Sequence, residues 1–249
     1  MNLVCLHSLA SAGMVGLRPF LRIWGDDLRP VPTLLLNAPG DHPACRRFDL
    51  PLAAHFESVL ALDDEPVAVF VGYLASDTQL TEVVGVLDRH PKRIARVIVD
   101  PVSGDQGRAY VAPDLIAAWP QLLERADLAF PNATELSLII PGEPHDAVDR
   151  WRDRFPRLET IVTGVPVGDH SLRSILHRPG RPAFWVDHLR RPGHYRGTGD
   201  AFAAVCLHEH LVRHIPLESA IAIAASRVSR AIDRAAARGM ADLCLDSQD

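Results

Sequence analysis

A glycine-rich segment directly before an apolar helical pattern is the part of this sequence best suited to chemistry. It reads Arg196-Gly197-Thr198-Gly199-Asp200, and the apolar run begins at Ala201. Glycines let the backbone turn tightly, so that N–H groups at a helix start can converge on an anion with the helix dipole behind them. A carboxylate beside such an anion hole is unfavourable unless it takes a proton from a nucleophile. The segment predicts phosphoryl transfer with Asp200 as the base; the alternative is a turn in which Asp200 only caps a helix.

Further polar residues follow predicted strands at the point where each strand ends. They are Ser8 after Leu3–Leu6, Gly72 and Tyr73 after Val67–Val71, Asp100 after Ile94–Val99, Asn132 to Glu135 after Leu128–Phe130, and Thr163 with Gly164 after Thr160–Val162. Parallel strands share one carboxyl edge, and open sheets of this kind bind ligands there. We therefore expect these residues to gather at one edge, close to the glycine-rich segment.

Strands and helices alternate along the chain. Helical spacing of apolar residues occurs at Met14–Trp24, Leu52–Leu62, Thr78–Arg89, Pro113–Leu123, His145–Phe155, Ala201–His214 and Leu217–Ala237, and further strands are expected at Val31–Leu36, Leu172–His177 and Ala183–Val186. This alternation predicts an α/β fold, a doubly wound and mostly parallel sheet with helices on both faces.

Three local features are also expected. Asp77 or Thr78 caps the helix that follows it, Asn132 caps another, and the segment 241–245 adds a final edge strand. The capping predictions rest on the short polar side chains, which can accept hydrogen bonds from the first N–H groups of a helix.

Composition narrows the class of protein. The chain has 249 residues, of which 47% are hydrophobic, so we expect a single domain spanning residues 1–249. The formal net charge of -5 and the lack of a dense basic run predict no nucleic-acid partner and no anionic membrane surface. Apolar stretches also stay below the roughly 20 residues that span a bilayer. The expected partner is a small molecule.

Cysteine and lysine usage adds two constraints. Cys5, Cys45, Cys206 and Cys244 are far apart and form no C-x-x-C pair, which predicts a reducing compartment, the cytoplasm. Lys92 is the only lysine and follows a proline, which excludes a Walker A loop. Any nucleotide chemistry must therefore use another architecture.

Six segments spread over most of the chain resemble the motifs of one kinase group. Residues 6–8 with Gly13 and Gly16 resemble I-Q-S-H-x-x-x-G-x-x-G-N, residues 71–76 resemble S-G-Y-L-G-S, residues 99–104 with 110–113 resemble D-P-V-M-G…V-A-P, residues 130–135 resemble P-N-x-x-E, residues 197–200 resemble the G-x-G-D anion hole and base, and residues 241–249 resemble E-L-Q-L-V-x-x-Q-D. On these motifs the sequence is similar to the pyridoxal kinase branch of the ribokinase superfamily.

The resemblance implies a ribokinase-like fold, usually a homodimer, that transfers the γ-phosphoryl group of ATP to the 5′-hydroxymethyl of pyridoxal, pyridoxine or pyridoxamine. It implies that Asp200 is the base and that the amides of Gly197, Thr198 and Gly199 stabilise the transferring group. By the same resemblance Ser8 and Tyr73 contact the pyridine ring, and Asp100 and Glu135 hold Mg²⁺. Asn132, Thr163 and Arg196 are the further candidate residues on the nucleotide side. The need for a monovalent cation stays open.

Three departures from the family pattern keep alternatives open. The substrate loop S-N-H-T-x-Y is replaced by residues 37–42, V-K-H is replaced by Val162-Thr163-Gly164, and the chain is shorter around residues 164–196, where Arg196 is the candidate phosphate contact. A kinase acting on hydroxymethylpyrimidine or a sugar-like alcohol is therefore a second hypothesis. A homologue that binds vitamin B6 or a nucleotide with weak or no turnover is the third.

Overall fold

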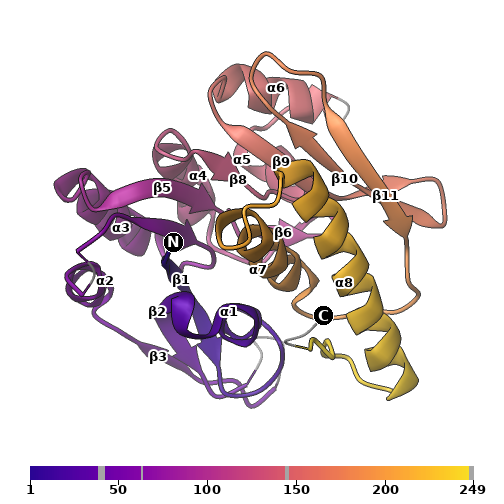
Figure 1. Cartoon of the computed structure of the whole chain (residues 1–249), viewed down its shortest axis with the longest axis horizontal. Helices are drawn as coiled ribbons and strands as arrows, with labels where there is room; N and C mark the ends of the chain where they lie inside the picture. The colour runs from indigo at the N-terminus through magenta and orange to yellow at the C-terminus, as the bar shows by residue number, and fades with distance from the viewer. Residues whose placement is uncertain (39–42, 63, 144–145, 247–249) are drawn as a thin grey trace.

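One mixed sheet organises the molecule in the computed structural model, which describes residues 1–38, 43–62, 64–143 and 146–246 (Figure 1). Its nine strands lie in the order β11-β10-β9-β8-β5-β4-β1-β2-β3. The strands are β1 (Leu3–Ala10), β2 (Leu28–Leu36), β3 (Arg47–Asp49), β4 (Val67–Val71), β5 (Ile94–Val99), β8 (Leu128–Ala129), β9 (Glu159–Val167), β10 (Ser171–His177) and β11 (Phe184–Leu189). The six central strands, β9, β8, β5, β4, β1 and β2, are parallel to one another. At the two edges, β3 pairs antiparallel with β2, β10 pairs antiparallel with β9, and β11 pairs antiparallel with β10.

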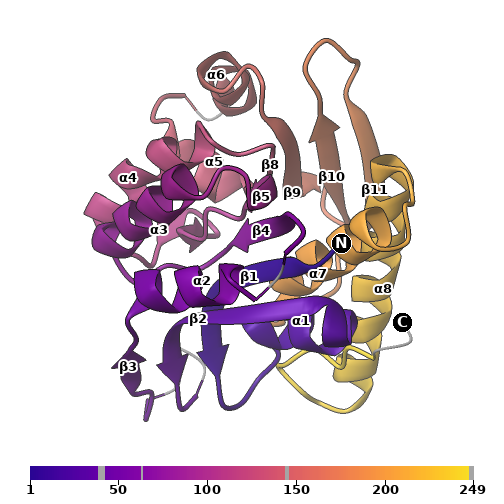
Figure 2. The same ribbon diagram turned by 60° about the vertical axis from the view of Figure 1, so that its left-hand side comes forward.

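Helices cover both faces of the sheet (Figure 2). One face carries α1 (Leu17–Trp24), α7 (Thr198–Leu211) and α8 (Leu217–Ala237), and the other carries α2 (Leu52–Leu60), α3 (Asp77–Arg89), α4 (Pro113–Leu123), α5 (Ala133–Ile139) and α6 (Ala147–Arg154). The short helix η1 (Gly25–Asp27) follows α1, and β6 (Gly104–Asp105) pairs with β7 (Arg108–Ala109) in a separate hairpin. The predicted doubly wound fold is confirmed. None of the helices formed by the described residues could span a membrane.

The alternation of side chains along the central strand β1 separates two cores. Leu3 and Cys5 belong to the core beneath α1, α7 and α8, whereas Val4 and Leu6 belong to the core beneath α2 to α6. Successive residues of a strand point to opposite faces of the sheet. His7, which follows the same alternation as Leu3 and Cys5, is therefore directed toward the layer that contains α7.

Several expected element boundaries need correction. The segment 241–245 is not a strand, because a single bridge joins Arg196 to Asp242 and the following leucines, Leu243 and Leu245, are buried in the core. The cap of α3 is Ser76 rather than Asp77 or Thr78, since its side chain accepts the N–H of Gln79. The predicted cap at Asn132 is confirmed.

Strand β9 is longer than the sequence predicts. It runs through Thr163 and Gly164 to Val167, because its second half pairs antiparallel with β10 beyond the point where its parallel neighbour β8 has ended. The predicted helix at 145–155 is observed as α6 from Ala147, and His145 lies outside the described residues. Helix α1 begins at Leu17, three residues after the predicted start.

The two edges of the parallel strands differ in chemistry. Lys92 is exposed in the turn between α3 and β5, where β5 begins. Met1, which is 53% exposed, precedes β1 at the same edge, since β1, β4 and β5 run in parallel. Most of the polar residues singled out in the sequence follow their strands and therefore lie toward the opposite, carboxyl edge. Ser8 is an exception, because β1 extends beyond the predicted Leu6 to Ala10 and contains it, just as β9 contains Thr163 and Gly164.

Candidate active site

Backbone hydrogen bonds between neighbouring chain segments align the polar residues near the carboxyl edge of the sheet. The N–H of Gly72 donates to the carbonyl of Leu6 (2.8 Å), that of Asp100 to Val71 (2.8 Å), that of Phe130 to Val99 (2.9 Å) and that of Thr163 to Pro131 (3.0 Å). The ends of β4, β5 and β8 are therefore level with the middle of β1 and the middle of β9. The expected gathering of polar residues along one edge of the sheet is observed.

Asp200, in the first turn of α7, reaches this edge from the neighbouring layer. Its Oδ1 lies 3.2 Å from Nε2 of His7, and its Oδ2 accepts the N–H of Gly16 at 2.6 Å. The Asp200 side chain is 17% exposed. Both carboxylate oxygens are thus held, yet the group keeps access to solvent. An ionised carboxylate can accept about four hydrogen bonds, so lone pairs remain for a further donor.

The turn into α7 requires glycine at Gly197. This residue caps the helix in the left-handed conformation (φ 80°, ψ 16°). A Cβ there would come within 1.7 Å of the carbonyl oxygen of Met14, so a larger residue would displace the chain before α1. The first N–H groups of a helix have no intrahelical partner and carry the positive end of the dipole. Thr198 and Gly199 present such groups at the start of α7, beside the Asp200 carboxylate.

Two more carboxyl groups, those of Asp100 and Glu135, are buried at this edge of the sheet. Burial raises the pKa of Asp100 well above its usual range, and the charges of Glu135 and Asp200 raise it further. Burial raises the pKa of Glu135 to about 8, although N–H donors from Asn132, Ser103 and Gly104 oppose this shift. In both cases the low-dielectric surroundings disfavour the charged form.

Glu135 is fixed by backbone N–H groups. Its Oε2 accepts the N–H of Asn132 (2.9 Å) and its Oε1 accepts that of Ser103 (3.0 Å), while the Asn132 side chain accepts the N–H of Glu135 (3.0 Å). Together Asn132 and Glu135 form a capping box at the start of α5. The structural role that a helix-start carboxylate usually has is therefore present at this position.

The carboxyl groups suit a magnesium ion that keeps other ligands. Mg²⁺ in phosphoryl-transfer sites is bound through one or two carboxylates, substrate phosphates and water. Asp100 and Glu135 are such a pair, and burial raises the pKa of both carboxyl groups, so a bound cation would favour their charged forms. A complete protein cage is not present: within the described ranges, no group of three or more histidine, cysteine or acidic side chains is arranged to hold a metal ion.

The two candidate pyridine contacts belong to neighbouring parts of the sheet, since Ser8 lies in β1 and Tyr73 follows β4. Ser8 is buried, with Oγ 3.4 Å from Nδ1 of His7. Tyr73 is half-buried and packs against the small cluster of Ala10, Leu34 and Leu36. The altered substrate loop at 37–42 falls largely outside the described residues, which end at residue 38 and resume at residue 43.

The candidate nucleotide-side residues are distributed along the same edge. Asn132 donates through Nδ2 to the carbonyl of Gly104 (2.9 Å) and bridges to Thr163. Arg196 precedes the glycine turn and donates from Nε to Oδ1 of Asp242 (3.1 Å), so its guanidinium is tied to the C-terminal segment. The structure thus brings Asn132 and Thr163 together and places Arg196 at the start of the cradle. Contact of Arg196 with phosphate stays a prediction.

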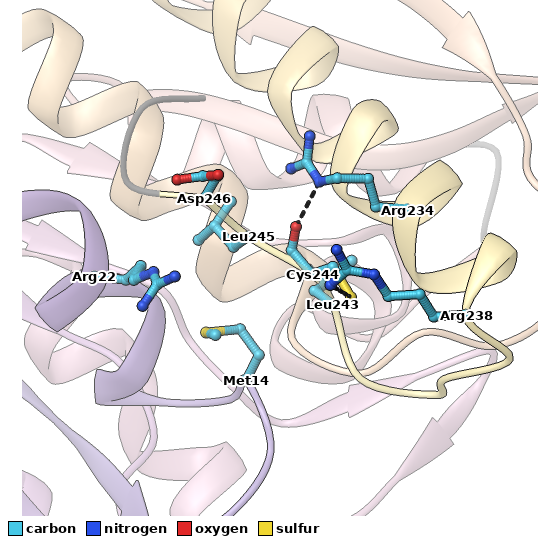
Figure 3. Close-up of a pocket in the computed structure, with 8 residues that line it drawn as sticks. All are labelled: Met14, Arg22, Arg234, Arg238, Leu243, Cys244, Leu245 and Asp246. Carbon is cyan, nitrogen blue, oxygen red and sulfur yellow. Dashed lines mark hydrogen bonds between the residues drawn. The ribbon is translucent and has the colours of Figure 1, made fainter.

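A cavity of about 370 Å³ lies between α1, the end of α8 and the C-terminal segment (Figure 3). Arg22 of α1 faces Arg234 and Arg238 of α8 across it, and Nε of Arg234 donates to the carbonyl of Cys244 (3.0 Å). Its lining is Met14, Arg22, Arg234, Arg238, Leu243, Cys244, Leu245 and Asp246. None of the residues predicted for the site lines this cavity. Met14 links the cavity to the cradle, since its carbonyl lies against Gly197.

His7 is the residue at this site to which the sequence analysis assigns no role. Its side chain is almost fully buried and contacts Asp200, which is 193 residues away in the chain. The available signal was its place in the segment of residues 6–8, directly after an apolar strand. Periodicity could place the side chain on the α7 face, but it could not identify the partner.

Comparison with known proteins agrees with the fold. The model of the phosphomethylpyrimidine kinase family matches residues 51–245, which is most of the chain. A provisionally named pyridoxal kinase of Schizosaccharomyces pombe is 26% identical over 226 residues, covering 82% of this chain and 72% of the relative. A similarly named protein of Caenorhabditis elegans is 28% identical over 149 residues, covering 55% of this chain and 46% of its own.

Solved structures of similar fold include two parasite enzymes. Pyridoxal kinase from Entamoeba histolytica has a TM-score of 0.87 at 21% identity, covering 98% of this chain and 92% of its own. Pyridoxal kinase from Leishmania donovani in complex with ADP has a TM-score of 0.82 at 22% identity, and the match covers 96% of this chain and 88% of the Leishmania chain. The chain belongs to the phosphomethylpyrimidine kinase family, in the pyridoxal kinase branch of the ribokinase-like superfamily, and is a phosphotransferase with an alcohol group as acceptor.

Proposed function

We propose that this protein transfers the γ-phosphoryl group of ATP to the 5′-hydroxymethyl group of pyridoxal or a related B6 vitamer. The observation that carries the proposal is the position of Asp200, held through both oxygens at the N-terminus of a glycine-started helix. The relatives support it, since several are named as pyridoxal kinases and one solved neighbour contains ADP.

Asp200 is the base in this proposal. Its carboxylate accepts the proton of the substrate hydroxyl as the oxygen bonds to phosphorus, and the N–H groups of Gly197, Thr198 and Gly199 stabilise negative charge on the transferring group. Phosphoryl transfer depends mainly on positioning and charge stabilisation, which a fixed carboxylate and a helix N-terminus supply. Ser8 of β1 and Tyr73, which follows β4, bind the pyridine ring.

Asp100 and Glu135 are the proposed magnesium residues. When bound, Mg²⁺ neutralises charge on the phosphates of ATP. Asp100 follows β5, where its backbone N–H is held by Val71, and the Glu135 carboxyl is held in the capping box before metal binding. Asn132, Thr163 and Arg196 form the nucleotide side of the site in this proposal. A bound monovalent cation is a further candidate that the activity assay can test with potassium and sodium salts.

Two properties of the whole protein complete the proposal. We propose a cytoplasmic location, supported by four cysteines that are all free in the structure. We also propose a homodimer, as the family resemblance implies. Size-exclusion chromatography with light scattering measures the mass directly, and a particle of one chain mass would contradict the dimer.

The test of function is an ADP-release assay on purified protein with Mg·ATP. Pyridoxal, pyridoxine, pyridoxamine, hydroxymethylpyrimidine and ribose are compared at equal concentration. We expect turnover of a B6 vitamer, and we expect Asp200→Asn to lower kcat by on the order of 10² to 10⁴ while ATP binding stays nearly unchanged, because a positioned base contributes about this much. Loss of ATP binding at unchanged kcat would instead indicate a capping role for Asp200.

Hydroxymethylpyrimidine is the second candidate substrate. Two observations favour it: the family model that matches the chain is described as phosphomethylpyrimidine kinase, and the substrate loop at 37–42 departs from the pyridoxal kinase motif. Higher kcat/KM for hydroxymethylpyrimidine than for every B6 vitamer would replace the leading proposal. Binding of pyridoxal or ATP without turnover of any alcohol would identify a binding protein instead.

A further inference from the structure

A buried histidine contacts the proposed base directly. His7 lies on the central strand β1, is 2% exposed, and stacks near Phe70 with ring centroids 6.4 Å apart and planes inclined by 12°. Its Nε2 is 3.2 Å from Oδ1 of Asp200. The strand and the stacking ring fix the position of the imidazole, so its contact with Asp200 is set by the fold and does not depend on a bound ligand.

The end of the neighbouring strand leaves room for this ring. A Cβ at Gly72 would lie 2.1 Å from Cδ2 and 2.5 Å from Nε2 of His7. Contacts this short do not occur, so any larger residue at position 72 would displace the imidazole from Asp200. Gly72 and His7 are therefore a matched pair on adjacent parallel strands.

The hydrogen bonds define which nitrogen of His7 carries the proton. The backbone N–H of Ser8 donates to Nδ1 at 2.9 Å, so Nδ1 acts as an acceptor and carries no hydrogen. In a neutral imidazole the hydrogen is then on Nε2, the atom that faces Asp200. His7 accordingly donates Nε2–H to the Asp200 carboxylate.

We propose that His7 is a positioning residue for the reaction, holding Asp200 through Nε2–H while Gly16 N–H holds the other oxygen; this inference rests on the proposed role of Asp200 as the base. One donor belongs to β1 and the other is the residue before α1, and because each holds a different oxygen they fix both the position and the rotation of the carboxylate. Each oxygen retains a lone pair, so the substrate proton still has an acceptor.

Two substitutions separate the hydrogen bond from the packing. His7→Gln keeps a side-chain N–H donor of similar reach, whereas His7→Leu fills the buried space without a donor. We expect His7→Leu to lower kcat on the order of 10- to 100-fold with the KM for ATP unchanged, as for loss of a hydrogen bond to a charged group. We expect His7→Gln to stay within a few-fold of the parent. Equal activity of both variants, or equal loss in both, would overturn the proposal.

A double substitution shows whether His7 acts through Asp200. In the Asp200→Ala background, His7→Leu has no carboxylate left to misplace and should cause little further loss of kcat. Independent losses that multiply would contradict a positioning role. Thermal unfolding of each variant, followed by circular dichroism, controls for stability, since a purely structural histidine would lower the midpoint without this dependence on Asp200.

Nitrogen NMR of histidine-labelled protein tests the contact without any turnover. The His7 resonances are identified as those missing from His7→Gln, and we expect the shifts of a neutral ring protonated at Nε2 that change in Asp200→Ala. Protonation at Nδ1, or no response to Asp200→Ala, would overturn the inference. If the parent protein phosphorylates no alcohol, the proposed function fails while this measurement still decides the His7–Asp200 contact.

Discussion

At the scale of single residues, the buried carboxyl of Glu135 makes stability depend on pH. Its pKa in the folded protein is about 8, mainly because of burial, against an ordinary value of 4.5. Between about pH 4.5 and pH 8, the folded protein therefore keeps a proton on Glu135 that the unfolded chain has released. Stability supplied by this group is fully present below about pH 4.5 and is lost as pH rises toward 8, by up to about 1.4 kcal/mol per pH unit in that window.

Urea unfolding of the metal-free protein at pH 6 and pH 8 measures this effect. We expect the contribution of Glu135 to make the protein less stable at pH 8, and we expect Glu135→Gln to show a flatter dependence on pH. Because Gln also changes the capping box, the comparison uses the slope of stability against pH and not the stability itself. An unchanged slope in Glu135→Gln would show that Glu135 titrates near its ordinary value.

The contacts of single residues show what sequence reasoning could reach. Asn132 was recognisable as a cap because its partner Glu135 is three residues away. The contact between His7 and Asp200 joins residues 193 positions apart and depends on how α7 docks on β1. Local pattern carries no information on that docking, and the resemblance aligned His7 with the glutamine of the motif without giving it a function.

At the scale of elements, the turn into α7 depends on the close approach of Gly197 to Met14. We expect Gly197→Ala to destabilise the protein by roughly 2 to 4 kcal/mol, since it combines an unfavourable positive φ with a clash against backbone. It should also lower kcat strongly, because the N–H groups of the cradle move with this turn. Urea unfolding and the ADP-release assay measure the two effects.

Gly168→Ala is the matched control for that substitution. Gly168 also has a positive φ, of 63°, but a Cβ there would meet nothing within 4 Å. We expect it to cost only about 1 kcal/mol and to leave kcat unchanged. Similar losses in both variants would mean that the contact between Gly197 and Met14 does not matter beyond backbone strain.

The ends of a helix or strand were predictable where the apolar pattern of its own residues determines them. Strand β5 and helices α4 and α8 begin and end as expected, because apolar periodicity changes sharply there. The extension of β9 was not predictable, since it is stabilised by pairing with β10 and not by its own sequence. The segment 241–245 has an apolar alternation typical of a strand, yet its leucines pack into the core without a neighbouring strand to pair with.

At the scale of the whole molecule, the sheet separates two cores that we predict to unfold together as one domain. Trp24 reports on the core beneath α1, α7 and α8, whereas Trp119 and Trp151 report on the opposite core. We expect a single unfolding transition with the same midpoint by tryptophan fluorescence and circular dichroism. Trp185 is exposed on β11, so a double variant, Trp24→Phe with Trp185→Phe, leaves Trp119 and Trp151 of the opposite core as the emitting residues and should unfold with coincident curves too. Separate midpoints would contradict a single domain.

Lys92 lies far from the edge of the sheet at which the proposed reaction would form pyridoxal phosphate. Pyridoxal and its phosphate carry an aldehyde that condenses with unprotonated amines, and lysine is the side chain that forms such Schiff bases. The only lysine of the sequence lies in the turn before β5, and Met1 precedes β1 at the same edge. Asp200 and the glycine turn lie at the other edge. In the proposed reaction a reactive product is thus formed where the protein offers no lysine to trap it, and it can be released with its aldehyde intact.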